Sequence, residues 1–271
     1  MDLNTITDIA RPRDRSGLPP FREGDAILGG GTWLFSEPQR TLRRLVDLAG
    51  LGWPPIENGA QELRLSATCT LAALDAHAAD APWAAAALVR RCCRSLWGSF
   101  KIWNMATVGG NLCLALPAAP MAALAVALDA VCEIWCPDGT DRLLPASGLI
   151  LAPQRTVLAP GEVLRALRIG RDRLHARYAV RQASLTEEGR SAALLAGRCT
   201  EAGGLALTIT ASVPRPLRLD FADAPAPDVL RAAVEAAGAA AGWYDDPHGA
   251  PDWRRHMTLR LAEQIRAELA T

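Results

Sequence analysis

Residues 106–113 read ATVGGNLC, and far upstream residues 27–34 read ILGGGTWL. Each stretch combines consecutive glycines with a neighbouring threonine. Glycine permits positive φ angles and close approach of a ligand to the backbone, and a run of exposed N–H groups forms a concavity suited to phosphate. Two such loops, each opening toward the N-terminus of a helix, can hold a diphosphate from both sides. Glycine content alone, however, favours tight turns at strand ends.

The two loops do not fit the common nucleotide motifs. Neither matches G-x-x-x-x-G-K-[ST] or G-x-G-x-x-G, so the sequence does not support a Walker or a Rossmann site.

The composition is that of an ordinary globular protein. Of 271 residues, 50% are hydrophobic and 21% are charged, which predicts one large domain or two modest ones. The 29 basic and 29 acidic residues cancel, so no net field attracts nucleic acid or anionic lipid. The N-terminus mixes charges without an apolar run, and the apolar stretch 121–131 is too short to cross a bilayer. We therefore expect a cytoplasmic protein with neither a nucleic-acid nor a membrane partner.

Seven cysteines are present, an odd number, and none forms a Cys-x-x-Cys pair. This pattern disfavours a disulfide framework, a structural zinc site and an iron–sulfur cluster held by this chain alone. Cys132 and Cys136 lie four residues apart, but without a His or Cys partner set they are better explained as apolar thiols. We expect no metal site.

Apolar periodicity and turn residues predict the order of elements and a domain boundary near residue 170. A strand at 26–34 runs into the first glycine turn, and Ser36-Glu37-Pro38 is expected to open a helix. A strand or helix ends at Gly50. The remaining predictions are two helices between Thr70 and Arg94 broken near Pro82, a helix at 119–129, strands at 130–137 and 162–170, two antiparallel strands at 177–184 and 204–213 flanking a loop, and helices at 226–242 and 251–269.

Several motifs together resemble those of one family. They are GGGTWL (29–34), IWNMATVGGNLC (102–113), PAAPMAALAVALDA (117–130) and VLAPGEVLRALRI (157–169), with SVPRPLRL (212–219) and DDPHGAPDWRRHMTLRLAEQIRAEL (245–269) following. In order, spacing and surroundings they resemble the FAD-binding subunit of the molybdenum hydroxylases. This family includes the medium subunit of carbon monoxide dehydrogenase and the flavin domain of xanthine dehydrogenase. The resemblance covers almost the whole chain.

The resemblance implies an α+β fold. Residues 1–170 are expected to form a two-subdomain FAD-binding domain of the vanillyl-alcohol-oxidase/PCMH-like type. Residues 171–271 are expected to form a smaller domain like the C-terminal domain of the carbon monoxide dehydrogenase flavoproteins, with a three-stranded antiparallel sheet and helices.

The resemblance also implies the residues of an FAD site. The first loop would wrap the diphosphate with Leu28, Gly29, Gly30, Gly31, Thr32, Trp33 and Leu34. The second would meet it from the other side with Ala106, Thr107, Gly109, Gly110 and Asn111. Ile102 would face the flavin region, Leu164 would pack on the ring system, and Arg181 would lie near the flavin. We assign no catalytic acid or base, because the protein's part is binding, orientation and tuning of the flavin.

The family's division of labour implies partner chains. Hydroxylation takes place at a molybdopterin centre on a large subunit, electrons cross two [2Fe-2S] clusters on a small subunit, and FAD delivers them to NAD or another acceptor. The chain would thus be the FAD-carrying electron-transfer subunit of a multi-subunit hydroxylase.

Five positions that are usually polar in the family are apolar or aromatic here: Trp33, Trp103, Leu114, Leu116 and Pro120. Each lost hydrogen bond to a bound polar group costs about 1 kcal/mol, so several together would weaken FAD binding strongly. Two alternatives therefore stay open. One is a degenerate homologue that has lost FAD and acts as a structural or interaction subunit, and the other is a stand-alone flavoenzyme with its own substrate.

Overall fold

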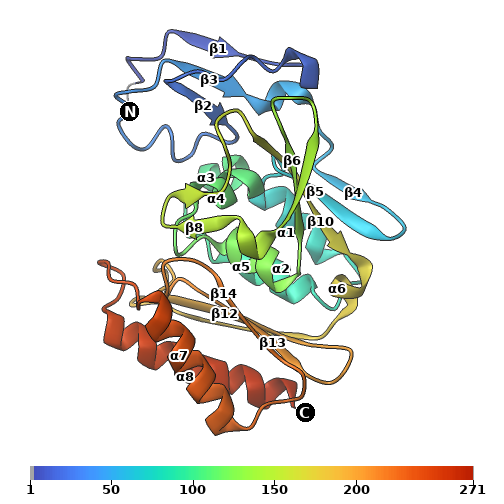
Figure 1. The fold of residues 1–271 in the computed structure, drawn as a ribbon, viewed down its shortest axis with the longest axis vertical. Coiled ribbons are helices and arrows are strands. Elements are labelled where there is room, and N and C mark those ends of the chain that lie inside the picture. Colours follow the sequence, from blue (N-terminus) through green and yellow to red (C-terminus); the bar gives the residue numbers. More distant parts are fainter. Residues whose placement is uncertain (1–2, 271) are drawn as a thin grey trace.

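The computed structural model describes residues 3–270 in three stacked parts (Figure 1). An N-terminal sheet lies at one end, a five-stranded sheet with short helices lies in the middle, and a four-stranded sheet with two long helices lies at the other end. The expected α+β fold is confirmed. In the part of the chain that the structure describes, no helix is long and apolar enough to cross a membrane.

The N-terminal sheet consists of β1 (Asp8–Ala10), β3 (Arg44–Asp47) and β2 (Asp25–Leu28), in that order and parallel. Short 3-10 segments follow β1 and β3, namely η1 (Arg15–Gly17) and η2 (Leu48–Leu51). The strand before the first glycine loop is confirmed. The helix expected at Ser36 is wrong: residues 37–43 contain no helix before β3 begins at Arg44, and Pro38 disfavours the helical conformation of Glu37 before it.

The middle part is built on an antiparallel sheet with the order β4-β5-β10-β6-β7. Its strands are β4 (Ile56–Asn58), β5 (Glu62–Ser66), β10 (Val163–Gly170), β6 (Val131–Trp135) and β7 (Asp141–Pro145). A short 3-10 segment η3 (Ala146–Gly148) and a small hairpin of β8 (Ile150–Ala152) and β9 (Arg155–Thr156) complete it. The strands predicted at 130–137 and 162–170 are confirmed.

Six short helices belong to the middle part: α1 (Leu71–Ala79), α2 (Ala86–Arg94), α3 (Phe100–Met105), α4 (Val108–Leu114), α5 (Pro120–Ala127) and α6 (Arg171–His175). The Thr70 hydroxyl accepts a hydrogen bond from the Ala73 N–H at 3.2 Å, as expected of an N-cap. All eight residues of α5 are buried, which explains why this helix is apolar on every side.

The third part contains β11 (Tyr178–Ala183), β12 (Ala193–Cys199), β13 (Leu205–Thr210) and β14 (Leu217–Phe221), which form an antiparallel sheet in chain order. Helices α7 (Pro227–Ala241) and α8 (Pro251–Leu269) cover one face, and α5 packs against β12 and β13. The sheet has four strands, where three were expected, and the segment expected to be a loop between two strands contains β12. Six of its seven residues are buried, so it shows no alternation of apolar and polar residues.

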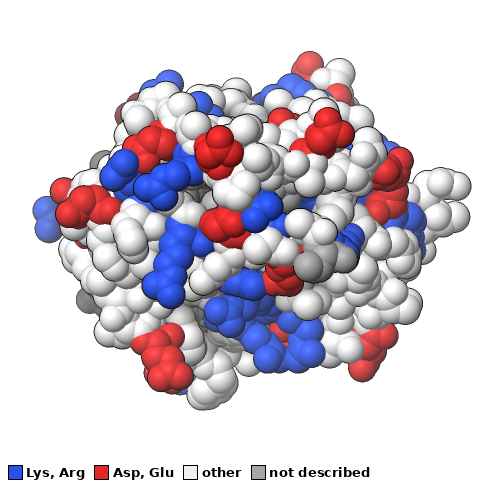
Figure 2. Space-filling view, turned by 90° about the horizontal axis from the view of Figure 1, so that it is seen from below, with Lys and Arg blue, Asp and Glu red and all other residues white. Residues whose placement is uncertain are grey.

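Charges of both signs cover the surface of this third part. On the face seen from below in Figure 2, basic side chains gather in one area and acidic side chains surround it. This mixture agrees with the zero formal net charge of the chain.

Candidate functional site

The structure brings the two glycine loops into direct contact, although they lie some seventy residues apart in the sequence. A Cβ atom added to Gly30 would lie 1.5 Å from the carbonyl oxygen of Met105, so any side chain at this position overlaps the backbone. A Cβ on Gly109 would lie 2.5 Å from the Cβ of Ala67, at the end of β5. These glycines are therefore required for close packing of one backbone against another.

The second loop differs from the exposed turn that the sequence suggested. The glycine pair lies in the first turn of α4, and Thr107 is its N-cap. All four N–H groups at this helix start are already bonded: Val108 to Cys69 O at 2.9 Å, Gly109 to Ala67 O at 2.8 Å, Gly110 to Thr107 Oγ1 at 3.1 Å and Asn111 to Thr107 O at 2.9 Å. They are not available to an anion without rearrangement.

The first loop has the opposite character. Between Gly30 and Leu34, five consecutive N–H groups donate no hydrogen bond to any residue in the range 3–270, and neither does the Thr32 hydroxyl. Most of these residues are half-buried, and Gly31 is buried at φ +72°. Successive free N–H groups in such a turn form a cradle for an anion. On the side of the first loop, the residues present therefore fit a diphosphate.

The remaining predicted residues of the second loop have structural contacts. The Asn111 side-chain oxygen accepts a hydrogen bond from Met121 N at 2.9 Å and so ties α4 to the start of α5. Pro120 occupies the first position of α5, where no N–H donor is needed. Among the departures from the family pattern, Trp103 donates its indole N–H to Leu96 O at 3.0 Å, which fixes α3 to the end of α2.

Ile102, Leu164 and Arg181 are distributed over three elements. Ile102 lies half-buried on α3, whose last residue, Met105, contacts the first loop. Leu164 is 4% exposed in the main core. Arg181 lies on β11 and pairs with Glu268 near the end of α8, so the structure does not bring it to the glycine loops.

A pocket of about 670 Å³ that the sequence did not indicate includes Trp97, in the segment between α2 and α3. Its walls come from the end of α2 and the segment after it, from β11 with its following loop, and from α8. The lining side chains include Trp97, Gln182, Ser184, Trp253 and Met257. Trp97 is 46% exposed, although it is a large apolar residue. The lining also includes the charged residues Arg91, Arg94 and Glu187, so the pocket combines two indole rings with a polar and charged wall.

The cysteine beside the second loop is chemically inert at neutral pH. Burial raises the pKa of the Cys113 thiol to about 12, and the same cause raises the pKa of Cys69 to about 12. Neither sulfur is a thiolate near neutral pH, so neither acts as a nucleophile or as a ready metal ligand.

The comparisons with known proteins identify the family. A model of the FAD binding domain in molybdopterin dehydrogenase matches residues 22–171, more than half of the chain. No curated protein sequence matches the chain.

Three solved structures are similar over nearly the whole chain. The cyanide-inactivated Cu,Mo-CO dehydrogenase has 25% identity and a TM-score of 0.81, with 96% of this chain and 97% of that chain covered. The reconstituted CO dehydrogenase from Oligotropha carboxidovorans has 24% identity and a TM-score of 0.82, with 98% and 99% covered. The quinoline 2-oxidoreductase from Pseudomonas putida 86 has 19% identity and a TM-score of 0.79, with 100% of both chains covered. The chain belongs to the family of FAD-binding subunits of the molybdenum hydroxylases.

Proposed function

We propose that the chain binds FAD and acts as the electron-transfer subunit of a multi-subunit molybdopterin and iron–sulfur hydroxylase. The observation that carries this proposal is the first loop, where five N–H groups and the Thr32 hydroxyl are unbonded among residues 3–270 and are available to a diphosphate beside the second loop. FAD would supply the redox chemistry, taking electrons from [2Fe-2S] clusters on a small subunit and passing them to NAD or another acceptor. A large molybdopterin subunit would carry out the hydroxylation.

The chain's own residues would bind and orient the cofactor. Gly30 to Leu34 would donate to the diphosphate oxygens, and the bonded N–H groups of α4 would add the positive end of a short helix dipole rather than direct hydrogen bonds. The six residues of α3 span roughly 9 Å, and the helix runs from the glycine loops toward Trp97. An extended dinucleotide could therefore place its phosphates at one end of α3 and its flavin ring in the pocket that includes Trp97.

We further propose that the boundary between the FAD-binding domain, 1–170, and the C-terminal domain, 171–271, lies in the segment around α6. This placement is supported by the end of β10 at Gly170 and by the start of the four-stranded sheet at Tyr178. The family match ends nearby, at residue 171.

One observation favours the alternative of a structural subunit without FAD. The N–H groups at the start of α4 are all bonded inside the protein, and Trp103 and Pro120 have structural roles of their own. In a chain that had lost its cofactor, we expect the N–H groups of the second loop to be bonded within the protein, as they are here. The N–H groups of the first loop, from Gly30 to Leu34, are not bonded within residues 3–270.

The experiment that decides between the two functions is titration of the full-length chain with FAD, followed by absorbance in the flavin bands after desalting. Binding supports the electron-transfer subunit. Failure to retain FAD, also when the partner subunits are co-expressed, would leave the structural role.

The variant Thr32→Val tests the first loop without changing its shape, because it removes only the hydroxyl. We expect FAD binding to weaken by about tenfold or more, since a hydrogen bond to a charged group contributes roughly 1.5–3 kcal/mol. Thr41→Val is the matched control, because Thr41 is exposed and its hydroxyl makes no hydrogen bond within residues 3–270. Equal FAD affinity in both variants would exclude Thr32 from the site.

A further inference from the structure

The N-terminal sheet is attached to the middle part through a small junction separate from the main core. Three buried residues, Leu48, Leu51 and Val163, form its centre, and four half-buried side chains pack around them: Leu18, Ile27, Trp53 and Trp135. Val163 and Trp135 belong to the five-stranded sheet, whereas the other residues belong to the N-terminal sheet and its connections. The first glycine loop directly follows β2, the strand that contains Ile27, so the junction determines where that loop lies.

Arg165 enters this junction from a bulge in β10. The register between β10 and β6 shifts between Leu164 and Ala166, which takes Arg165 out of the regular ladder. The residue is only 5% exposed. Its guanidinium carbon lies 4.3 Å from the ring centre of Trp53 and 5.8 Å from that of Trp135. The two indoles meet edge to face at 5.2 Å, so the cation packs against both rings.

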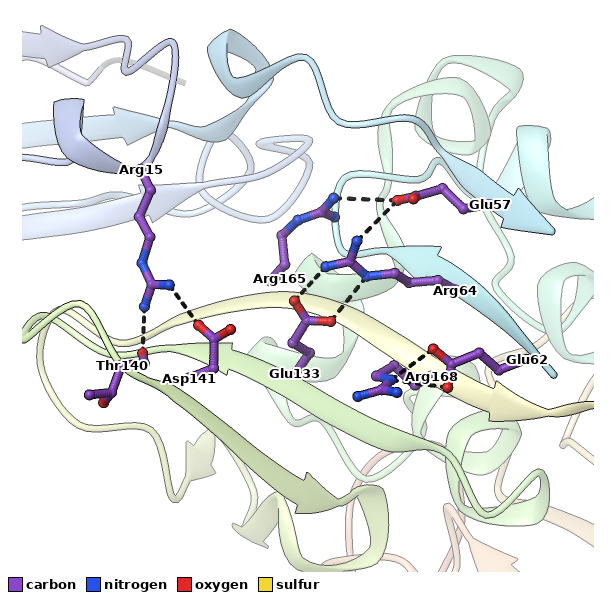
Figure 3. Close-up of polar contacts among 9 residues, drawn as sticks. All are labelled: Arg15, Glu57, Glu62, Arg64, Glu133, Thr140, Asp141, Arg165 and Arg168. Carbon is purple, nitrogen blue, oxygen red and sulfur yellow. Dashed lines mark hydrogen bonds and ion pairs between the residues drawn. The ribbon is translucent and has the colours of Figure 1, made fainter. Parts of the chain in front are cut away.

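A second arginine extends the same arrangement from the N-terminal side. Arg15 packs over the ring of Trp135 at 4.9 Å and forms an ion pair with Asp141 at 2.6 Å. Figure 3 shows its guanidinium reaching the β6–β7 hairpin, where it also donates to Thr140 O. Cations and indoles thus alternate across the junction and join the two parts.

Arg165 is poorly neutralised for a buried cation. Within residues 3–270 its one ion pair is with Glu57, at 3.4 Å, and Glu57 is shared with Arg64, which also pairs with Glu133 (Figure 3). Its Nη1 is buried without a hydrogen-bond partner among the described residues. Burial, with the nearby positive charge of Arg64, lowers the pKa of Arg165. An apolar side chain of similar length would occupy this position at less cost in free energy. Stabilisation of the fold therefore does not explain why this residue is an arginine.

Arg165 connects to both glycine loops. Its carbonyl oxygen accepts from Ala67 N at 3.0 Å, and Ala67 O accepts from Gly109 N at 2.8 Å, which leads to the second loop. In the other direction Trp53, beneath the guanidinium, belongs to the same small core as Ile27, in the strand that ends at the first loop.

We propose that Arg165 is a positioning residue for the cofactor site: it clamps the N-terminal sheet to β10 and thereby sets the spacing between the two glycine loops. The inference rests on the proposed function, because it assumes that these loops hold a diphosphate. Arg165 itself acts through the loops and does not touch the reacting ring.

The test compares three full-length proteins by calorimetric titration with FAD and with ADP, and by thermal unfolding. Arg165→Met removes the charge and the planar group but keeps a long side chain. The matched control is Arg168→Met on the same strand, because Arg168 is more exposed and pairs with Glu62 away from the indoles (Figure 3). We expect Arg165→Met to weaken the binding of FAD and of ADP by the same factor, about tenfold or more, with a Tm equal to or above that of the wild type. Arg168→Met should bind both ligands like the wild type.

Each other outcome has a distinct meaning. Wild-type affinity for both ligands in Arg165→Met overturns the inference alone, and so does a loss confined to FAD, because ADP carries the diphosphate but not the ring. A wild-type chain that binds neither ligand overturns the proposed function and the inference with it. If Arg165→Met does not fold, Trp53→Leu takes its place, since it removes the ring beneath the guanidinium, and unchanged FAD and ADP binding in a folded Trp53→Leu chain contradicts the clamp.

Discussion

Two buried arginines, Arg254 in the C-terminal part and Arg165 at the N-terminal junction, differ in how completely they are bonded. Arg254 is 1% exposed, and each of its three nitrogens donates a hydrogen bond. Its acceptors include Gly249 O at 2.7 Å, Ala192 O at 2.9 Å and the carboxylate of Asp246. Arg165 has one distant carboxylate, two indole faces and an unbonded Nη1.

The two arginines thus hold their surroundings by different contacts. Arg254 joins three segments of the C-terminal part through strong hydrogen bonds, so it anchors that part in one arrangement. Arg165 clamps two parts together through packing on aromatic rings and an ion pair with Glu57 at 3.4 Å. The cofactor loops lie beside the second arrangement, and the following experiments test this difference.

The largest expected effect is that of Arg254→Met. The variant leaves several carbonyls and Asp246 without their donor in a buried site, which typically costs about 3–5 kcal/mol of unfolding free energy. Urea denaturation measures this loss. Arg255→Met is the control, because Arg255 is exposed and, in the part of the chain that the structure describes, pairs only with Glu235, so we expect a change below about 0.5 kcal/mol. Similar stability of the two variants would refute the role of Arg254 as an anchor.

The second variant disrupts the contact between the two glycine loops, not the contacts of Arg254. Gly30→Ala places a Cβ where the Met105 carbonyl lies, so the two loops must separate. We expect a loss of about 1–3 kcal/mol in unfolding free energy together with loss of FAD retention. In Gly17→Ala the added atom makes only ordinary contacts, at 3.6 Å from Pro12, and both properties should stay at the wild-type level. FAD retention by Gly30→Ala would show that the contact between the loops does not matter for the cofactor.

A third variant, expected to change stability alone, tests whether the anchor extends along α8. The Thr258 hydroxyl donates to the Ser212 hydroxyl at 2.8 Å, and both residues are buried. Thr258→Val leaves the Ser212 oxygen unbonded and should cost about 1–3 kcal/mol without changing FAD affinity. Thermal unfolding and flavin titration on the same sample separate the two effects, and a parallel loss of FAD affinity would contradict the separation of anchor and junction.

The smallest effect concerns acid stability at the junction side of the five-stranded sheet. Arg142 holds the pKa of Glu162 below its ordinary value through a bidentate ion pair. Because the folded-state pKa is lowered, this stabilisation is complete above the unfolded-state pKa of 4.5 and is lost as the pH falls through the folded-state pKa. Glu162→Gln should therefore lose less stability than the wild type as the pH falls below 4.5 and through the lowered pKa of Glu162. Identical pH profiles would contradict this assignment.

Much of the fold follows from local sequence signals. Caps, prolines and amphipathic spacing predict several helices correctly. These are the helix capped by Thr70, the helix after Pro82, and the long helices 227–241 and 251–269. β12 could not be found in this way, because it is buried on both faces and has no alternation. The helix expected at Ser36 does not form, because Pro38 disfavours the helical conformation of the residue before it.

The sequence predicted only part of the candidate site. Glycine pairs and their resemblance to a family indicated both loops, but not that the N–H groups of one are bonded and those of the other are free. Trp97 and Trp253 gave no signal, because their pocket forms between α2, β11 and α8, which are distant in sequence. Arg165 gave none either, since an arginine in an alternating strand ordinarily faces solvent.

The sequence by itself determined most of the helices and many of the strands, and, through a set of motifs in a fixed order, the family to which the chain belongs. Only the tertiary structure decided which hydrogen-bonding groups are satisfied and which buried charge lacks a partner. The physical reason is that propensity, capping and periodicity are properties of neighbouring residues, whereas the bonding of Gly109 to Ala67, or of Arg254 to Ala192, depends on chain segments that meet only after folding.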